Sequence, residues 1–478
     1  MKLRELLHGI DILSAAADLD CEIREVCYDS RAVQPGDLFV AVRGYATDGH
    51  KYIAGALQKG AAAVVCEEAD AGVPAVIVAD SRAALADIAC NRFDHPSRKL
   101  TMVGVTGTNG KTTTTTLVKH ILETQGAKVG LIGTNENIIG ETVIPADRTT
   151  PESYELQALF ARMVEAGCTH CVMEVSSHSL VLDRVRGVQF QSAVFTNLTQ
   201  DHLDFHHTME EYRKAKALLF SISDKGAINL DDPAAQAMLD DAKCACLTYS
   251  AKQTADLMAQ GIDLRADGIG FTAVHGGVSA AVELGIPGQF SVSNALSAIA
   301  ACLLLGYDVQ TCADALRSAH GVKGRIEVVP TPTDYTVLID YAHSPDGVDN
   351  ILRAVRGFTR GRVIALFGCG GDRDRTKRPK MGAIAAELAD HCIVTSDNPR
   401  TEQPEAIIDD IMPGMVNARG PVDRICDRRE AIFHALTIAE AGDSIVLMGK
   451  GHETYQEIDH VKHHMDEREI VAEYFASK

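Results

Sequence analysis

Short apolar runs alternate with amphipathic stretches along the whole chain. The runs at 37–42 and 61–65 are typical of buried strands, and turns rich in Gly and Pro follow them. Further strands are predicted at 102–105, 129–132, 171–174, 193–196, 226–230, 337–340, 363–367, 392–395 and 444–448, and a helix is predicted at 292–305. Because strands that alternate with helices form mainly parallel sheets covered by helices, the pattern predicts an α/β fold.

Two interruptions of this pattern suggest domain boundaries. A polar stretch with a proline lies at 94–98, and a second break lies at 324–332. A chain of 478 residues corresponds to about three domains at roughly 100–200 residues each. We therefore expect a smaller N-terminal α/β domain at 1–98, a central domain at 99–328 and a C-terminal domain at 329–478.

Composition and charge limit the classes of partner. The formal net charge is −19, which disfavours nucleic-acid binding because that binding depends on neutralising phosphates with Lys and Arg. A local cationic pocket can still bind a small anionic substrate. The N-terminus has no signal-peptide pattern, and no stretch approaches the ~18 apolar residues of a membrane span. We expect a soluble, cytoplasmic and monomeric protein that does not bind membranes.

The cysteines and the C-terminal histidines are not expected to form metal sites. Thirteen cysteines are scattered along the chain, which favours reduced thiols. Cys168 and Cys171 form one CxxC pair, and Cys244 and Cys246 have the wrong spacing to complete a zinc site. Burial is the favoured interpretation of these cysteines. A solvated surface is favoured for the histidines of the tail: His460, His463 and His464.

A glycine-rich turn lies between the predicted strand at 102–105 and the helix that follows. Its backbone N–H groups can wrap a phosphate chain at a helix N-terminus, Lys111 can reach the terminal phosphates, and the Thr112 hydroxyl can bind Mg²⁺. The expected nucleotide-binding residues are Gly107, Thr108, Asn109, Gly110, Lys111, Thr112 and Thr113. The first Gly of the general phosphate-loop pattern would fall on Val105. The turn alone does not separate kinases, ATPases, GTPases and ligases.

Carboxylates and histidines follow the next strands. Glu174 and His202 lie just after predicted strand ends, where ligands gather in open α/β sheets. Carboxylate and imidazole groups at this place are plausible Mg²⁺ ligands, although Mg²⁺ prefers oxygen. The segment 211–216, which ends at Lys216, is by itself typical of a solvated charged turn.

Five segments in order resemble the Mur ligase family. They are Thr-Gly-Thr-Asn-Gly-Lys-Thr at 106–112, Glu-Val-Ser-Ser-His at 174–178, Thr-Asn-Leu-Thr-Gln-Asp-His-Leu-Asp at 196–204, Asn294, and Asp-Tyr-Ala-His-Ser-Pro at 340–345. The resemblance covers nearly the whole chain and is nearest to members that add the third peptide residue to UDP-muramoyl-dipeptide; the segments at 28–31 and 35–40 support it. It implies a UDP-binding domain, a central phosphate-loop ATPase and a Rossmann-like C-terminal domain that receives the amino acid.

The resemblance also implies roles for single residues. Thr112, Glu174, His202 and Lys216 correspond to Mg²⁺ ligands, and Lys216 corresponds to a lysine that the family carbamylates, which turns a cation into an anionic oxygen ligand. Asn294, Arg325 and Asp340 correspond to contacts with adenine, phosphate and ribose, and Ser30 to a uridine contact. The muramoyl-dipeptide contacts correspond to Thr149, Thr150, Ser176 and Arg184, whereas Leu182 stands where the family often has Gln.

The segment Ser-Asp-Asn-Pro-Arg at 396–400 bears on which amino acid is added. Asp397, Asn398, Pro399 and Arg400 match the pattern of the family's diaminopimelate-adding members. Arg400 has a fork of donors suited to a carboxylate, and meso-diaminopimelate differs from lysine by one extra carboxylate. Arg373, Gly449 and Glu453 match further positions that bind the amino acid, with Glu453 opposite its ammonium group.

The expected reaction is an ATP-dependent ligation. ATP would convert the D-Glu side-chain carboxylate to an acyl phosphate, with Lys111 and Mg²⁺ neutralising charge, and the amine would then displace phosphate. His202 and Lys216 would hold metal, no residue would act as a covalent nucleophile, and the domains would close around the substrates. The alternatives are a lysine-adding muropeptide ligase, a folylpolyglutamate-type ligase, and a nucleotide-dependent switch or scaffold.

Overall fold

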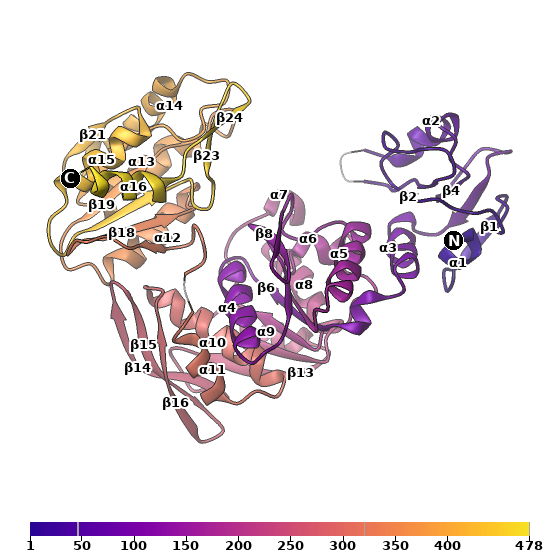
Figure 1. The fold of residues 1–478 in the computed structure, drawn as a ribbon, viewed down its shortest axis with the longest axis horizontal. Coiled ribbons are helices and arrows are strands. Elements are labelled where there is room, and N and C mark those ends of the chain that lie inside the picture. The colour runs from indigo at the N-terminus through magenta and orange to yellow at the C-terminus, as the bar shows by residue number, and fades with distance from the viewer. Residues whose placement is uncertain (45–46, 320, 478) are drawn as a thin grey trace. The chain divides into compact units, whose positions relative to one another are not determined.

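The computed structural model describes residues 1–44, 47–319 and 321–477. Its contacts divide the chain into two compact units. The first contains residues 1–249 and 300–307, and the second contains residues 250–299 and 308–478. Three large sheets alternate with helices along the chain, so the α/β expectation is confirmed. Each unit is described separately below (Figure 1).

A five-stranded sheet forms the N-terminal part of the first unit. Its strand order is β1-β5-β4-β3-β2, with β2 to β5 parallel and β1 antiparallel to β5. The strands are β1 (Ile12–Ala15), β2 (Val26–Cys27), β3 (Leu38–Val40), β4 (Ala63–Cys66) and β5 (Ala75–Val78), and the helices are α1 (Leu3–Leu6), α2 (Ile53–Gln58) and α3 (Ser81–Arg92). The stretch at 94–98, where we expect a domain boundary, lies between α3 and the next strand. It contains two left-handed residues, Asp94 and His95, and the start of a 3-10 helix, Pro96–Lys99.

The central sheet of the first unit has a parallel core. The order β13-β12-β11-β6-β10-β7 is parallel throughout, and the antiparallel strands β8 and β9 extend it at one edge. The strands are β6 (Thr101–Thr106), β7 (Val129–Ile132), β8 (Glu136–Ile139), β9 (Thr142–Pro145), β10 (His170–Glu174), β11 (Ser192–Phe195), β12 (Lys225–Asn229) and β13 (Ala245–Ser250). The helices are α4 (Lys111–Thr124), α5 (Ser153–Glu165), α6 (Ser177–Val181), α7 (Leu203–His206), α8 (Met209–Ala217) and α9 (Ala235–Asp241).

Helix α3 connects the two parts of the first unit by packing against α5 (Figure 1). Polar contacts cross the same junction. The Tyr28 hydroxyl lies 2.8 Å from a Glu155 oxygen, Tyr154 bonds Glu25, and Arg186 donates to Asp87 over 3.0 Å. Burial is the largest cause that raises the pKa values of both tyrosines, so their hydroxyls stay protonated donors to these carboxylates.

The second unit begins with an antiparallel meander and ends in a parallel sheet. The meander contains β14 (Leu257–Arg265), β15 (Gly268–His275) and β16 (Val278–Leu284), with helices α10 (Gln289–Leu304) and α11 (Val309–Leu316) following it. The C-terminal sheet has the order β17-β18-β22-β19-β20-β21, parallel except for β17. Its strands are β17 (Glu327–Val329), β18 (Thr336–Asp340), β19 (Val363–Phe367), β20 (His391–Val394), β21 (Val422–Arg424) and β22 (Ser444–Met448).

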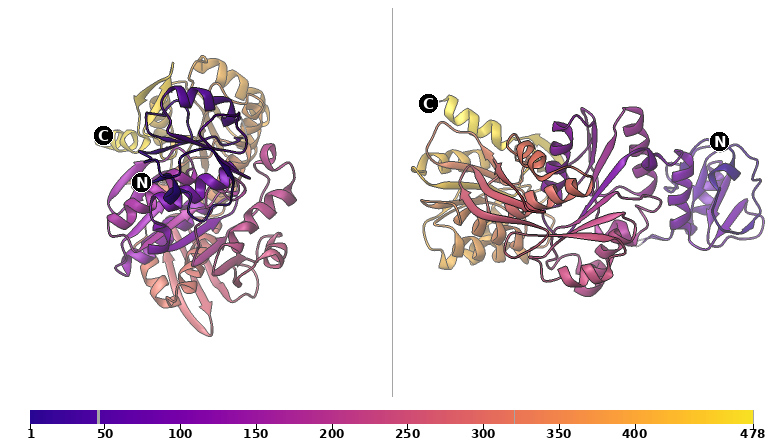
Figure 2. Two further views of the ribbon diagram at one scale, coloured as in Figure 1. Left: turned by 90° about the vertical axis from the view of Figure 1, so that its right-hand side faces the viewer. Right: turned by 90° about the horizontal axis from the view of Figure 1, so that it is seen from below.

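Helices cover both faces of the C-terminal sheet (Figure 2). Leu338 and Val446 point to the face under α12 to α14, whereas Val337 and Ile445 point to the face under α15 and α16. Both faces are buried, which explains why these strands read as continuous apolar runs rather than alternating ones. The helices are α12 (Pro345–Arg356), α13 (Lys377–Leu388), α14 (Pro404–Ile411), α15 (Arg428–Ile438) and α16 (Glu467–Ala476), and a hairpin of β23 (Tyr455–Ile458) and β24 (Val461–His464) precedes α16.

The structure confirms burial of the CxxC pair and exposure of the tail histidines. Cys168 and Cys171 are buried, whereas Cys244 and Cys246 are half-buried, and all four are free thiols. The C-terminal histidines His460, His463 and His464 are exposed on or beside the β23–β24 hairpin. In the described part of the chain, no helix is both long enough and apolar enough to cross a membrane.

Candidate active site

The glycine-rich turn joins β6 to the N-terminus of α4, as the sequence predicts. Gly107 and Gly110 have φ values of 150° and 83°, which are left-handed conformations that a side chain disfavours. A Cβ atom on Gly107 would lie 1.9 Å from the Thr196 hydroxyl oxygen. The turn therefore needs glycine at Gly107 for space as well as for conformation. Thr112 and Thr113 lie in the first turn of α4.

The segment after β11 holds this turn in place. The Thr108 N–H donates to the Asn197 carbonyl over 2.8 Å, and the Asn109 N–H donates to the Asn197 side chain over 2.9 Å. Thr196 completes the contact by donating its hydroxyl to the Asn109 carbonyl over 2.7 Å. The residues that the sequence places after two different strands therefore meet at one edge of the sheet, as their topology requires.

Two lysines converge on the carbonyls of the turn. The Lys111 ammonium lies 2.9 Å from the Gly107 oxygen and 2.8 Å from the Thr108 oxygen, and Lys216 donates to the same Gly107 oxygen over 2.9 Å. Lys216 is only 1% exposed, so the solvated-turn interpretation is wrong for this residue. Burial, and secondly the charge of Lys111, lower the pKa of Lys216 well below its usual value. Both effects shift Lys216 toward its neutral amine form relative to a solvated lysine.

Glu174 is a buried carboxylate at the end of β10. It is 1% exposed and accepts hydrogen bonds from the Thr134 N–H, over 2.9 Å, and from the Thr134 hydroxyl, over 3.0 Å. The Thr149 hydroxyl lies 3.0 Å from that of Thr134. The Thr150 hydroxyl donates to the Glu174 carbonyl over 2.8 Å. The structure therefore brings the predicted dipeptide residues Thr149 and Thr150 beside a predicted metal ligand.

Ser176 and Arg184 join this group. The Ser176 N–H donates to the Thr150 hydroxyl over 3.1 Å, and Arg184 donates to the Thr150 carbonyl over 3.2 Å. Ser176 also begins α6 by accepting the Ser179 N–H, and Leu182 ends that helix. All four predicted dipeptide residues thus lie in one polar cluster of the first unit. Ser30, the predicted uridine contact, lies in the N-terminal sheet region, where its carbonyl accepts from Lys59 over 2.9 Å.

Three arginines surround Glu152, and the sequence analysis missed two of them. Arg82, Arg148 and Arg184 lie 3.3, 3.8 and 3.3 Å from the same Glu152 oxygen. Burial is the largest cause that lowers the pKa of Arg184. One carboxylate faces three guanidinium groups, so the cluster keeps excess positive charge and suits an anionic ligand. Arg82 comes from the N-terminal part, 70 residues from Glu152 in the chain, and no local pattern marks it.

Histidines form an unpredicted cluster next to the turn. His202 has φ of 52° and its ring lies edge-on to that of His178, with centroids 4.9 Å apart. His206 is buried, its Nε2 lies 2.8 Å from the Ser177 hydroxyl, and burial lowers its pKa to about 4. His206 therefore remains neutral at physiological pH. Among described residues, Glu174 and His202 do not gather with a third His, Cys, Asp or Glu ligand.

In the second unit, the segment at 397–400 forms one polar cluster with the loop after β22. Lys450 is completely buried, and its ammonium lies 2.7 Å from the Asn398 side-chain oxygen and 2.8 Å from Glu453. Asn398 also donates to Glu453 over 2.9 Å. Gly449 approaches Asp397 so closely that a Cβ would lie 3.0 Å from its carboxylate. Lys450 therefore already supplies Glu453 with a cation.

Arg400 lies beside this cluster with part of its guanidinium engaged. Its Nε lies 3.1 Å from a Glu457 oxygen and its Nη1 donates to the Gly371 carbonyl over 2.8 Å. The Nη2 nitrogen has no hydrogen-bond partner among the described residues. A guanidinium has five N–H donors, so Arg400 retains donors for an incoming carboxylate. Arg373 is exposed and follows the Gly370–Gly371 turn, in which a Cβ on Gly371 would lie 1.9 Å from the Pro399 oxygen.

The remaining predicted nucleotide contacts also lie in the second unit. The buried Asp340 carboxylate accepts from the Ile326 N–H over 2.9 Å and from the Ala342 N–H over 2.8 Å, and burial raises its pKa. The guanidinium of Arg325 lies 5.3 Å from the Tyr341 ring centroid. Asn294 is buried in α10. Asp340 and Arg325 are thus neighbours, as a shared ribose-phosphate site requires.

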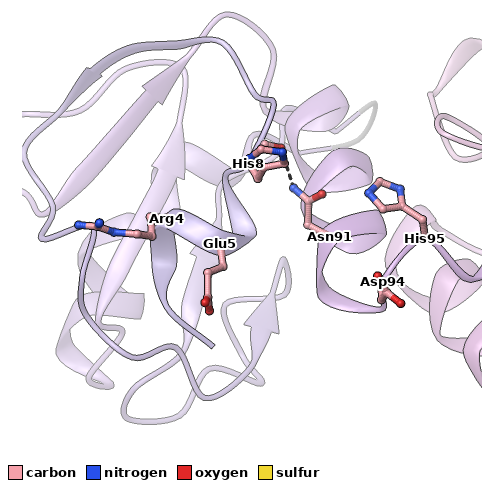
Figure 3. Close-up of a pocket in the computed structure, with 6 residues that line it drawn as sticks. All are labelled: Arg4, Glu5, His8, Asn91, Asp94 and His95. Atoms are coloured by element: carbon pink, nitrogen blue, oxygen red, sulfur yellow. Dashed lines mark hydrogen bonds between the residues drawn. The ribbon is translucent and has the colours of Figure 1, made fainter.

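An open groove lies in the N-terminal part, apart from every predicted site residue. Arg4, Glu5, His8, Asn91, Asp94 and His95 line it (Figure 3). The Asn91 amide donates to the backbone carbonyls of Leu6 and His8, which joins α3 to α1. The groove is therefore a structural junction between two helices.

Comparisons with known proteins decide the family. The description "Mur ligase family, catalytic domain" matches residues 22–93, "Mur ligase middle domain" matches 105–302, and "Mur ligase, glutamate ligase domain" matches 324–451. A relative from Clostridioides difficile (strain 630), which is called UDP-N-acetylmuramoyl-L-alanyl-D-glutamate--2,6-diaminopimelate ligase, is 45% identical over 99% of both chains. The chain belongs to the Mur ligase family.

Two further comparisons agree with this membership. A Mur ligase of the same name from Caldanaerobacter subterraneus subsp. tengcongensis is 48% identical over 100% of this chain and 99% of its own. A solved structure with that name superposes with a TM-score of 0.75 and 34% identity over 100% of this chain and 99% of that one. The similarity extends over all three sheets, which confirms the three-domain Mur ligase architecture that the sequence analysis expected.

A buried ion pair supports the polar cluster at 397–400 in this Mur ligase. Arg428 and Glu467 are almost fully buried and lie 2.8 Å apart. Arg428 also donates to the carbonyls of Ser396, over 3.2 Å, and Met448, over 2.8 Å. These carbonyls immediately precede Asp397 and Gly449, so one guanidinium fixes the starts of both loops that carry the polar cluster.

We expect Arg428→Met to destabilise the C-terminal domain strongly. It leaves the Glu467 carboxylate buried without its cation, and removing one partner of a buried pair costs about 3–5 kcal/mol. Burial already raises the pKa of Glu467. Urea unfolding of the full chain measures the loss. The matched control is Arg429→Met, because Arg429 is half-exposed and pairs with the exposed Glu473, a pair worth about 0–1 kcal/mol. Equal stability of the two variants would contradict this role.

Proposed function

We propose that this chain is the ATP-dependent ligase that adds meso-2,6-diaminopimelate to UDP-N-acetylmuramoyl-L-alanyl-D-glutamate during peptidoglycan synthesis. The observation that carries the proposal is the Arg400 cluster, Asp397, Asn398, Arg400, Gly449 and Glu453, found in a family member whose relatives have this name. We also propose three domains, at 1–98, 99–328 and 329–478. We further propose that the enzyme is a monomer and that it acts in the cytoplasm, where ATP and nucleotide-linked precursors are available.

The turn at 107–113 would hold the ATP phosphates. The first turn of α4 presents backbone N–H groups and positive potential, and Lys111 lies above the turn, where its ammonium can move from the Gly107 carbonyl to a phosphate. Asn294, Arg325 and Asp340 would contact the adenine, phosphate and ribose of the nucleotide. The D-Glu carboxylate takes the terminal phosphoryl group of ATP, and this gives an acyl phosphate and ADP.

The residues around Glu174 fit a divalent metal. Glu174 and Thr112 offer oxygen donors, which Mg²⁺ prefers, and His202 lies at the same edge of the sheet. A bound Mg²⁺ would neutralise charge on the phosphoryl group. Lys216 fits only after its amine reacts with CO₂ to form a carbamate. The burial and the lowered pKa of Lys216 support this modification, because CO₂ reacts with the neutral amine.

The muropeptide would lie against the polar cluster of the first unit. Thr149, Thr150, Ser176 and Arg184 surround the end of β10, and the three arginines at Glu152 supply positive charge to an anionic substrate. Ser30 would contact the uridine. Where Leu182 replaces the glutamine that the family often has, the neighbouring Arg184 and Ser176 would make the polar contacts.

Specificity for the diacid follows from the cluster at 397–400. The free donors of Arg400, with Arg373 nearby, would bind one carboxylate of diaminopimelate, and Glu453 with Asp397 would face its ammonium group. Lysine lacks that carboxylate, so its binding would leave the guanidinium without a partner in a largely enclosed place. The free amine then attacks the acyl carbon, an amide bond forms, and inorganic phosphate leaves with the bonding electron pair.

Phosphate release with purified chain, ATP, Mg²⁺ and UDP-muramoyl-dipeptide tests the proposal. Release should rise with meso-diaminopimelate and remain near the background with lysine. Stimulation by lysine alone would identify the lysine-adding alternative. Release that does not depend on the muropeptide would favour the nucleotide-switch alternative, and release that depends on a folate acceptor would favour the folylpolyglutamate type.

A further inference from the structure

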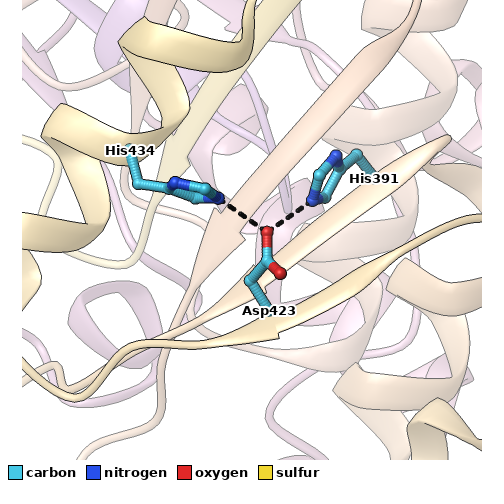
Figure 4. Close-up of side chains that lie close together, drawn as sticks. All are labelled: His391, Asp423 and His434. Carbon is cyan, nitrogen blue, oxygen red and sulfur yellow. Dashed lines mark hydrogen bonds and ion pairs between the residues drawn. The ribbon is translucent and has the colours of Figure 1, made fainter.

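Two histidines and an aspartate converge at the edge of the C-terminal sheet, outside the proposed active site. The Nε2 atoms of His391 and His434 each lie 2.7 Å from the same Asp423 carboxylate oxygen (Figure 4). Among the described residues, this is the one group of three or more His, Cys, Asp or Glu side chains whose ligand atoms all lie within 4.8 Å of one another. Neither the family resemblance nor the proposed reaction uses these residues.

The fold fixes the three side chains from three separate elements. His391 begins β20 and lies on the same face as Ile393, two positions along. Asp423 in β21 is the partner of Ile393 in the parallel register, so it projects to the same face. Helix α15, which carries His434, covers that face. The arrangement therefore does not depend on one flexible loop.

The donor set suits a transition metal better than magnesium. Two imidazoles and one carboxylate match the ligands of zinc sites that keep a water in the fourth position, whereas Mg²⁺ prefers oxygen alone. Tetrahedral zinc with ligand distances of about 2.0–2.1 Å spaces its ligand atoms about 3.3 Å apart. The present N···O distances of 2.7 Å would have to widen by about 0.6 Å, which small rotations of two side chains allow.

Access from solvent is available on one side. The His391 side chain is 10% exposed, whereas Asp423 and His434 are 35% and 37% exposed. An ion can therefore enter past the two outer ligands and find the third one held by the sheet. The histidines near the glycine-rich turn are less suited to bind an ion. His206 Nε2 already contacts the Ser177 hydroxyl, and the rings of His178, His202 and His206 pack against one another.

We propose that His391, Asp423 and His434 bind one divalent transition-metal ion of the zinc class. The ion takes the Nε2 lone pairs of both imidazoles and one Asp423 oxygen, and the two N–H protons that now bond Asp423 are displaced to Nδ1 or to solvent. The bound metal fastens α15 to the edge strand β21. Helix α15 begins with Arg428, which bonds the carbonyls just before Asp397 and Gly449. The bound metal therefore also stabilises the helix that holds these two loops.

Metal titration of the full chain tests this proposal without substrates, so its result is independent of the proposed ligase function. Chelator-treated protein is titrated with Co²⁺, followed by the visible absorption of tetrahedral cobalt, and Zn²⁺ is then added as competitor. We expect one site that is lost in His434→Asn, with affinity lowered about 100-fold or more, since even outer-shell changes cost about 10–100-fold. The matched control is His464→Asn, which removes an exposed histidine paired with Glu469 over 2.7 Å.

Thermal unfolding gives a second readout. Zinc at a hundred times its dissociation constant should raise the midpoint of the wild type and of His464→Asn by roughly 5–10 °C, but not that of His434→Asn. If His434→Asn does not fold, Asp423→Asn replaces it, because Asp423 is equally accessible. Equal metal binding by the wild type and both cluster variants, or no binding by the wild type, would leave the three residues as a hydrogen-bonded triad and overturn the proposal.

Discussion

Lys216→Ala should reduce the turnover number of the ligase by about 10²–10³ or more, the size of effect seen when one electrostatic group of a catalytic site is removed. The variant removes the buried amine that donates to the Gly107 carbonyl, and with it the carbamate that we propose as a metal ligand. Added bicarbonate should not restore activity, because no amine remains to react. Steady-state phosphate release at saturating ATP, muropeptide and amino acid measures the loss.

Lys214→Ala is the matched control for this variant. Lys214 is on the same helix, α8, but its side chain is 63% exposed and pairs with Glu210. Its removal should leave activity close to that of the wild type. Circular dichroism of both variants separates loss of function from loss of fold. Full activity of Lys216→Ala would remove the carbamate from the mechanism, whatever the control does.

Arg400→Met should raise the KM for meso-diaminopimelate by about 10–100-fold, because a hydrogen bond to a charged group is worth about 1.5–3 kcal/mol. Activity with lysine, which has no distal carboxylate, should change little, so the preference between the two amino acids should shrink. The measurement is kcat/KM for each amino acid at saturating ATP and muropeptide. The variant should also lose some free energy of unfolding, because the contacts of Arg400 with Glu457 and Gly371 are removed.

Arg424→Met serves as the control because Arg424 is in the same sheet region but pairs with the exposed Glu405 and Asp409. It should change neither KM nor the preference. If Arg400→Met keeps the preference of the wild type for the diacid, Arg400 does not read the distal carboxylate and another group, such as Arg373, must do so.

Strand positions were predictable because both faces of the parallel strands are buried. The runs at 129–132, 363–367 and 444–448 coincide with β7, β19 and β22. The antiparallel strands β8, β9 and β14 to β16 were missed. Of these, β9 and β14 are mostly exposed or half-buried, so they do not form the continuous apolar runs that indicate a buried strand. Their place in a sheet is decided by the partner strand rather than by their own sequence.

Contacts between predicted site residues could be predicted where the order of the strands alone brings the residues together. Thr196 and Asn197 follow β11, and the turn at 107–110 follows β6. Because β11 and β6 are neighbouring parallel strands, the two segments meet. Burial of charged groups could not be predicted, since Lys216 and Lys450 occur in polar segments that look solvated. Likewise, no local pattern indicates that Glu457 engages Arg400 from 57 residues away. The family resemblance, rather than the residue pattern, indicated Lys216.

The most direct test of the account measures amide formation itself. The purified chain is incubated with ATP, Mg²⁺, UDP-muramoyl-dipeptide and an equimolar mixture of meso-diaminopimelate and lysine, and the products are resolved by mass. The account predicts a product that carries diaminopimelate, formed with one phosphate per amide bond. A product that carries only lysine, or phosphate released without any amide product, would contradict it.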